Sequence, residues 1–170
     1  MINWTSCTLF IWLLALRTSN AALPRVGVSQ ECTKGWLHIP PFCYKSTEDL
    51  YQNYTDAMKT CERQNSHLPL LKYEKHYKDF MEKKAELHLD DSYFAWLGLN
   101  DMVKEGDYRW LDGTSLNDTF GATHEVAPWD MFEPIPDEEL NCAEVWDTGE
   151  WLVNFCDAEN LVICQKNENT

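Results

Sequence analysis

The chain has 170 residues and is strongly acidic, with 28 Asp and Glu against 14 Lys and Arg and a formal net charge of −14. Such a charge repels the phosphates of nucleic acids and of anionic membranes, which argues against both as partners. It is compatible with cations, basic proteins or neutral sugars. We favour the simpler interpretation that the acidity keeps the protein in solution.

The first 22 residues have the pattern of a secretory signal peptide. Thr8–Leu16 is an apolar core of nine residues, within the range of about 7–15 for a signal and short of the roughly 20 needed to span a membrane. Ala21 and Ala22 suit cleavage, whereas the lack of Lys or Arg before the core leaves an uncleaved anchor as the alternative. Removal of residues 1–22 leaves 148 residues with a net charge of −15, because Arg17 is the only charge lost. No later run is apolar enough to cross a membrane, so we expect one secreted, extracellular domain.

The cysteines of the mature chain number six once Cys7 is removed with the signal. An even number in a secreted chain predicts three disulfides, although spacing alone allows fifteen pairings. A zinc site is disfavoured, because the sequence has neither a Cys-x-x-Cys pair nor a His-x-x-x-His pair.

The mature chain is predicted to begin with a short lead-in over 23–31 and a small hairpin over 32–45 that turns at Pro40-Pro41. Two helices are predicted to follow. Residues 53–64 predict a helix capped by Thr55 or Asp56, and residues 70–87 predict a second, longer helix. Its expected surface ion pairs are Glu74 with Lys78 and Asp79 with Lys83.

Short strands and one long loop follow. The predicted strands are Phe94–Leu99, Tyr108–Leu111, Asn141–Asp147, Glu150–Cys156 and Leu161–Lys166, with a C-terminal tail over 167–170. Residues 114–136 predict no regular structure. A loop of that length inside a compact domain is uncommon unless it has a function.

The ordered motifs of this chain resemble those of the C-type lectin-like domain family from Cys32 to Lys166. The matching residues are Trp36 and Cys43-Tyr44, Trp96-Leu97-Gly98-Leu99, Glu105-Gly106, Trp110, Asp112-Gly113, Trp129, Glu133-Pro134, Cys142-Ala143-Glu144-Val145, Gly149-Glu150-Trp151, and Ile163-Cys164. The resemblance implies an α+β fold with two helices flanking antiparallel sheets and a long irregular loop. It also implies the disulfides Cys32–Cys43, Cys61–Cys164 and Cys142–Cys156.

Sugar binding in this family generally depends on a calcium ion in the long loop, and most of the residues that hold it are missing here. The family's Glu-Pro-Asn type motif reads Glu133-Pro134-Ile135, its carboxylate two residues before Cys142 is Leu140, and its Asn-Asp pair is Leu152-Val153. Aliphatic side chains cannot coordinate a hard cation that requires about 6–8 oxygen ligands. The resemblance therefore implies no confident metal or cofactor, and Glu133 is expected to be solvated or hydrogen-bonded within the protein.

A rearranged calcium site is the alternative for this loop. Its oxygen donors would be Glu133 with Glu138 or Glu139, together with Asn141 and Asn154. The same loop is longer than is usual in the family, and Phe120 and His124 lie in the extra segment. They are candidate contacts for a protein partner, since aromatic residues are enriched in interfaces.

Two Asn-x-Thr sequons, at Asn53 and Asn117, are candidate glycosylation sites. The leading function is a secreted recognition protein that binds an extracellular protein or a glycan through the long loop without the usual calcium site. The alternatives are a calcium-dependent lectin with rearranged ligands and an acidic extracellular structural protein. An enzyme is not expected, because no nucleophile elbow, zinc motif or phosphate loop occurs.

Overall fold

The computed structural model describes residues 32–89, 94–120 and 127–168, so the predicted signal peptide, the lead-in and His124 lie outside the described residues. Within these residues one mixed sheet has the strand order β1-β2-β7-β3-β5-β6, with β4 added beside β3. The strands are β1 (Leu37–Ile39), β2 (Phe42–Gln52), β3 (Phe94–Asn100), β4 (Arg109–Trp110), β5 (Leu140–Trp146), β6 (Trp151–Phe155) and β7 (Asn160–Asn167). No helix in the described ranges is long and apolar enough to cross a membrane.

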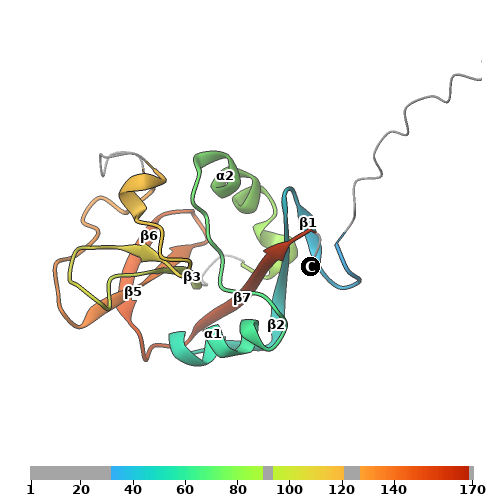
Figure 1. Cartoon of the computed structure of the whole chain (residues 1–170), viewed down its shortest axis with the longest axis horizontal. Coiled ribbons are helices and arrows are strands. Elements are labelled where there is room, and N and C mark those ends of the chain that lie inside the picture. The colour runs from blue at the N-terminus through green and yellow to red at the C-terminus, as the bar shows by residue number, and fades with distance from the viewer. Residues whose placement is uncertain (1–31, 90–93, 121–126, 169–170) are drawn as a thin grey trace, which may run out of the picture.

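The sheet is antiparallel except where β3 meets β7. These two strands run parallel, with Ala95 opposite Leu161, and this pair differs from the wholly antiparallel arrangement expected from the sequence. Both strands are buried, and their apolar side chains form the centre of the core. In Figure 1, β5 and β6 lie on the left of the molecule and β2 and β7 on the right, with β3 between them.

Helix α1 (Tyr54–Glu62) begins where its sequence offers a cap, but the cap is a different residue from those expected. The side chain of Asn53 accepts a hydrogen bond from the backbone N–H of Asp56 at 2.9 Å, so neither Thr55 nor Asp56 is the N-cap residue. The helix buries Tyr54, Ala57 and Cys61 against the sheet.

The second predicted helix is divided into two shorter elements. Helix α2 (Glu74–Glu82) ends before Lys83, and the 3₁₀ helix η1 (Lys84–Leu87) ends at His88, which has a left-handed conformation with φ 61°. The ion pair between Glu74 and Lys78 forms as predicted, at 2.6 Å. The predicted pair of Asp79 with Lys83 is wrong, because Asp79 pairs with Lys75.

Lys83, the other half of that predicted pair, bonds to Glu86 instead. The end of the helix is the reason, because Lys83 is the C-cap residue of α2, with φ −107° and ψ 6°, and no longer follows the α-helical spacing that would place it over Asp79.

Three disulfides join the ends of the fold. Cys61–Cys164 links α1 to β7, Cys142–Cys156 links β5 to the end of β6, and Cys32–Cys43 closes the N-terminal hairpin. These are the pairings that the family resemblance implies. Helices α1 and α2 lie on opposite sides of the β2–β7 strand pair in Figure 1, and the Cys61–Cys164 bond ties α1 to β7.

Candidate functional site

The long loop after β4 is fixed at its base by tryptophans. Trp151, at the start of β6, is completely buried. Its ring meets those of Trp110, Phe120, Trp129 and Tyr77 nearly at right angles, with centroids 5.2–6.1 Å apart. Edge-to-face contacts of this kind are favourable beyond simple burial. The aromatic cluster therefore holds the loop against the sheet.

Phe120 belongs to this cluster, and its predicted role as an exposed protein contact is wrong. Only 6% of the residue is exposed, and its ring lies 5.2 Å from that of Trp151. The short 3₁₀ helix η2 (Leu116–Asp118) precedes it, and the backbone N–H of Phe120 donates to the carbonyl oxygen of Leu116 at 3.2 Å. His124, its proposed companion, lies outside the described residues.

The carboxylate of Glu133 is used to hold the backbone. Its Oε2 accepts the N–H of Ile135 at 3.1 Å and, across the loop, the N–H of Val153 in β6 at 3.3 Å. The peptide bond between Glu133 and Pro134 is cis. One side chain thus closes the loop on itself and ties it to the strand.

The positions of the usual calcium site do not fit a calcium ion. Ile135, Leu140, Leu152 and Val153 provide only hydrocarbon, and one oxygen of Glu133 already accepts two backbone N–H groups. Calcium in proteins takes about 6–8 oxygen ligands, mostly carboxylates, carbonyls and amides. Among the described residues, no group of three His, Cys, Asp or Glu side chains could hold a metal ion.

Members of the rearranged ligand set take part in hydrogen bonds within the protein. Asn141 donates its side-chain N–H to the carbonyl oxygen of Glu138 at 2.7 Å, and the backbone N–H of Glu139 is held by Asp137. Asn154 faces a different group, since it donates to the carboxylate of Glu144 at 2.9 Å. These candidates are therefore engaged in separate local hydrogen bonds.

Loss of Glu133 gives a direct test of its structural role. We expect Glu133→Ala to lower the free energy of unfolding by about 1 to 2 kcal/mol, because two backbone N–H groups lose a charged acceptor. The same loss should be measured in urea titrations with calcium and with EDTA. Glu139→Ala, whose side chain is exposed, serves as the control and should change little. A calcium-dependent stabilisation of the wild type that disappears in Glu133→Ala would contradict this role.

Glu144 is a buried carboxyl group that sequence reasoning left without a role. It is 4% exposed and accepts hydrogen bonds from Asn154 and Asn160. Burial raises its pKa above the ordinary value, and the two amide hydrogen bonds only partly offset that rise. The folded protein therefore favours the protonated form more than the unfolded chain does.

This shift predicts a pH dependence of stability. As the pH falls from neutral through the raised folded pKa of Glu144 and on to its unfolded value of about 4.3, the wild type should gain stability relative to Glu144→Gln. Glu150 is a control of opposite sign, because the Thr148 hydroxyl holds its pKa below the usual range. The wild type should lose stability relative to Glu150→Gln only as the pH falls from about 4.3 through this lowered folded pKa. Thermal melts from pH 7 to about pH 2 measure both differences, and parallel curves for Glu144→Gln and wild type would refute the first.

Sequence reasoning did not bring Asp101 and Glu105 together with Glu138. Asp101, Glu105 and Glu138 line a hollow of about 250 Å³ beside the β3–β4 loop, together with Asn141. Burial first, and then the charges of Asp101 and Glu138, raise the pKa of Glu105. Asp101 and Glu105 lie four residues apart, a spacing visible in the sequence, whereas the approach of Glu138 depends on the folded loop.

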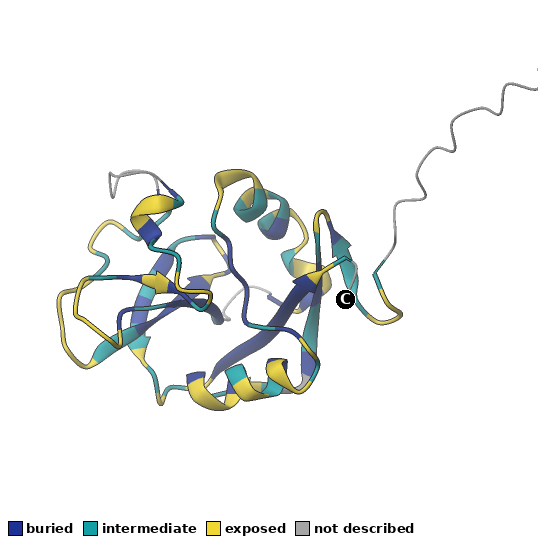
Figure 2. Cartoon of the chain, in the orientation of Figure 1, coloured by how far each residue is buried: buried dark blue, intermediate teal, exposed yellow. Residues whose placement is uncertain are grey.

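The tip of the long loop presents apolar side chains to solvent. Met131 is 82% exposed, Phe132 79% and Ile135 42%, and Figure 2 shows the loops on this side of the molecule largely as exposed. The aromatic cluster at the base of the loop is buried, whereas these three side chains lie outside that cluster and face solvent. Their arrangement places an apolar tip where the usual metal ligands are missing.

Comparison with known proteins identifies the family. The family model described as the Lectin C-type domain matches residues 51–166, more than half of the chain. The chain belongs to the C-type lectin domain family. This C-type lectin domain is 30% identical over 138 residues to C-type lectin domain family 4 member M of Hylobates lar, which covers 79% of this chain and 31% of that protein.

Other relatives extend the same likeness. The mouse asialoglycoprotein receptor 2 is 26% identical over 140 residues, 81% of this chain and 43% of its own length. This C-type lectin domain thus spans less than half the length of these relatives.

Among solved structures, the carbohydrate-recognition domain of the mouse scavenger receptor C-type lectin gives a TM-score of 0.67 at 23% identity, covering 80% of this chain and 98% of that one. A calcium-independent type II antifreeze protein gives 0.63 at 19%, covering 80% and 94%. Identities this low establish the shared fold alone.

Proposed function

We propose that this C-type lectin domain is a secreted recognition module that binds an extracellular protein through the tip of its long loop, without calcium at the usual site. The observation that carries the proposal is the exposure of Met131 and Phe132 on a loop whose ligand positions are aliphatic. Methionine and aromatic residues are enriched in the cores of protein interfaces.

The construction of the loop supports recognition by a preorganised surface. The backbone N–H of Trp151 donates to the carbonyl oxygen of Pro128 at 2.8 Å, and the backbone N–H of Asp130 donates to the carbonyl oxygen of Trp151 at 3.0 Å. Together with the hydrogen bond from Val153 to Glu133, these contacts fix the loop on both sides of its apolar tip. A rigid loop loses less conformational entropy on binding, which favours affinity.

The charge around the tip indicates the character of the partner. Asp137, Glu138 and Glu139 follow the apolar residues and are exposed. A partner with an apolar patch bordered by basic residues would complement this surface and be attracted to it over a distance.

A glycan ligand is the second candidate. It is favoured by the family match and by a relative named as an asialoglycoprotein receptor. In this case too the usual calcium positions supply no ligand set, so we expect binding to persist in EDTA.

Signal cleavage after residue 22, secretion, and glycosylation at the exposed Asn117 remain predictions of this proposal. The N-cap role of Asn53 makes that sequon the less favourable of the two.

Capture experiments with matched loop variants test the proposal. Phe132→Asp should reduce ligand capture from extracellular fluid by about tenfold or more, as expected for loss of an aromatic anchor. Val103→Asp is the control, because Val103 is 95% exposed on the neighbouring β3–β4 loop and should leave capture unchanged. Capture should be the same in calcium and in EDTA. Equal capture by both variants, or loss of capture in EDTA, would reject the proposal.

A further inference from the structure

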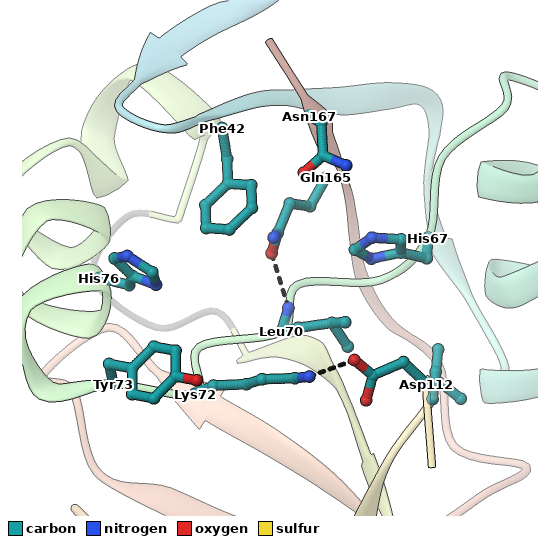
Figure 3. Close-up of a pocket in the computed structure, with 10 residues that line it drawn as sticks. Phe42, His67, Leu70, Lys72, Tyr73, His76, Asp112, Gln165 and Asn167 are labelled. Atoms are coloured by element: carbon teal, nitrogen blue, oxygen red, sulfur yellow. Dashed lines mark hydrogen bonds and ion pairs between the residues drawn. The ribbon is translucent and has the colours of Figure 1, made fainter. Parts of the chain in front are cut away.

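A second cavity lies outside the long loop. It has a volume of about 360 Å³ and is enclosed by side chains from β2, β7, the segment leading into α2, and the turn after β4. Figure 3 shows these side chains surrounding one opening, with Leu70 and Gln165 near its centre. None of its lining residues belongs to the loop at 127–140. Its volume lies within the range of about 300–1,000 Å³ typical of small-molecule sites.

One wall of this cavity is aromatic. The ring of His76 lies edge-on to Phe42 at 5.1 Å and to Tyr73 at 5.4 Å. Tyr73 is 53% exposed at the rim, although its ring is the kind of group that usually packs inside. Figure 3 shows the three rings together on one side of the opening. This wall offers aromatic side chains to a ligand.

The opposite side carries polar groups whose orientation is fixed. Gln165 is 1% exposed, and its Oε1 accepts the backbone N–H of Leu70 at 2.6 Å. Its amino group is therefore the remaining donor of that carboxamide. The ring of His67 donates from Nδ1 to the carbonyl oxygen of Leu68 at 2.8 Å, which leaves Nε2 of the neutral ring as an acceptor.

The charges in the lining cancel. Lys72 forms an ion pair with Asp112 and also donates to Thr114 at 3.0 Å. Burial opposes ionisation of Asp112, but hydrogen bonds from Lys72 and Thr114 outweigh it and hold the pKa of that carboxyl below its usual range. Burial lowers the pKa of His76. Because Lys72 and Asp112 already pair with each other, an ionised ligand would have to disrupt that ion pair, which disfavours it relative to a neutral one.

We propose that this cavity binds the ring of an uncharged sugar without calcium. A pyranose has a face of C–H groups that can pack on Phe42 and Tyr73, and hydroxyl groups at its edge that both donate and accept. The amino group of Gln165 and the Lys72 ammonium are donors for such hydroxyls, while Nε2 of His67 and the carboxylate of Asp112 are acceptors. The site is separate from the loop tip and does not depend on the function proposed for it.

The test uses ¹⁵N-labelled full-length mature protein in EDTA, titrated with methyl glycosides of glucose, galactose, mannose and N-acetylglucosamine, with methyl glucuronide as the charged probe. At least one neutral glycoside should shift the amide signals of Leu70, Tyr73 and Gln165 saturably, and the glucuronide should bind more weakly. Tyr73→Ala should weaken the binding by about threefold to tenfold, the range expected for one aromatic contact. Phe132→Ala, on the loop, should leave it unchanged.

The proposal would be overturned if none of the neutral glycosides shifted these signals, or if the glucuronide bound as well as they did. Unchanged affinity in Tyr73→Ala would also overturn it, as would saturable binding of indole in place of every sugar. Because the Phe132→Ala control separates the two sites, failure of this proposal and failure of the loop proposal give different results.

Discussion

Replacement of both Cys61 and Cys164 by alanine is expected to destabilise the domain more than the loss of either other disulfide. The bond joins residues 103 apart in the sequence. Restricting an unfolded loop of that length contributes about 4.7 kcal/mol in the chain-entropy estimate. Since domains are typically stable by only about 5–15 kcal/mol, we expect the variant to be largely unfolded or to melt at a much lower temperature. Circular dichroism melts measure the change.

The N-terminal disulfide provides the comparison. Cys32 and Cys43 are 11 residues apart, so their replacement by alanine should cost about 3 kcal/mol by the same estimate. It should leave the sheet and the core intact. Equal losses in the two double variants would show that loop length does not determine the contribution of these bonds.

Truncation of Trp151 is the second large effect that we expect. The side chain is completely buried and contacts four aromatic rings. Replacement of a buried Trp or Phe by alanine usually costs about 3–5 kcal/mol through lost burial and the cavity that remains. Trp151→Ala should therefore lose stability in this range in urea titrations. It should also release the base of the long loop and so reduce ligand capture.

Trp146 is a matched control for Trp151. It lies on β5, is 38% exposed, and stacks on Phe94 with ring centroids 5.5 Å apart. Trp146→Ala should cost about 1 kcal/mol, close to the value of one partly exposed aromatic pair. If both tryptophan variants lost the same stability, burial in the aromatic cluster would not be the origin of the effect.

Much of the fold could be predicted from local sequence patterns. Aromatic and apolar runs predicted β3 and the C-terminal strands to within a few residues, because those strands are buried. The pattern did not predict the extension of β2 through Ser46 to Gln52. This polar segment pairs with β7 after an irregularity between Ser46 and Tyr51. Strand pairing supplied by a distant segment overrides weak local propensity.

The candidate site was predictable where it depended on residue type and not where it depended on packing. The replacement of calcium ligands by Ile135, Leu152 and Val153 could be recognised in the sequence, and so could an alternative hydrogen-bonding role for Glu133. Burial of Phe120 could not, since it depends on Trp151 from a distant strand. The cavity beside Tyr73 had no linear motif, because its walls come from widely separated segments.

We propose that Glu133 holds the long loop and that the loop binds no calcium at the usual site, and the amide signals of Ile135 and Val153 test this. Both N–H groups donate to the Glu133 carboxylate, so a metal ion that took this carboxylate would displace them. We predict that ¹⁵N–¹H spectra recorded in EDTA and in millimolar calcium will have these two signals at the same positions. A saturable, calcium-dependent shift of both signals would contradict this proposal.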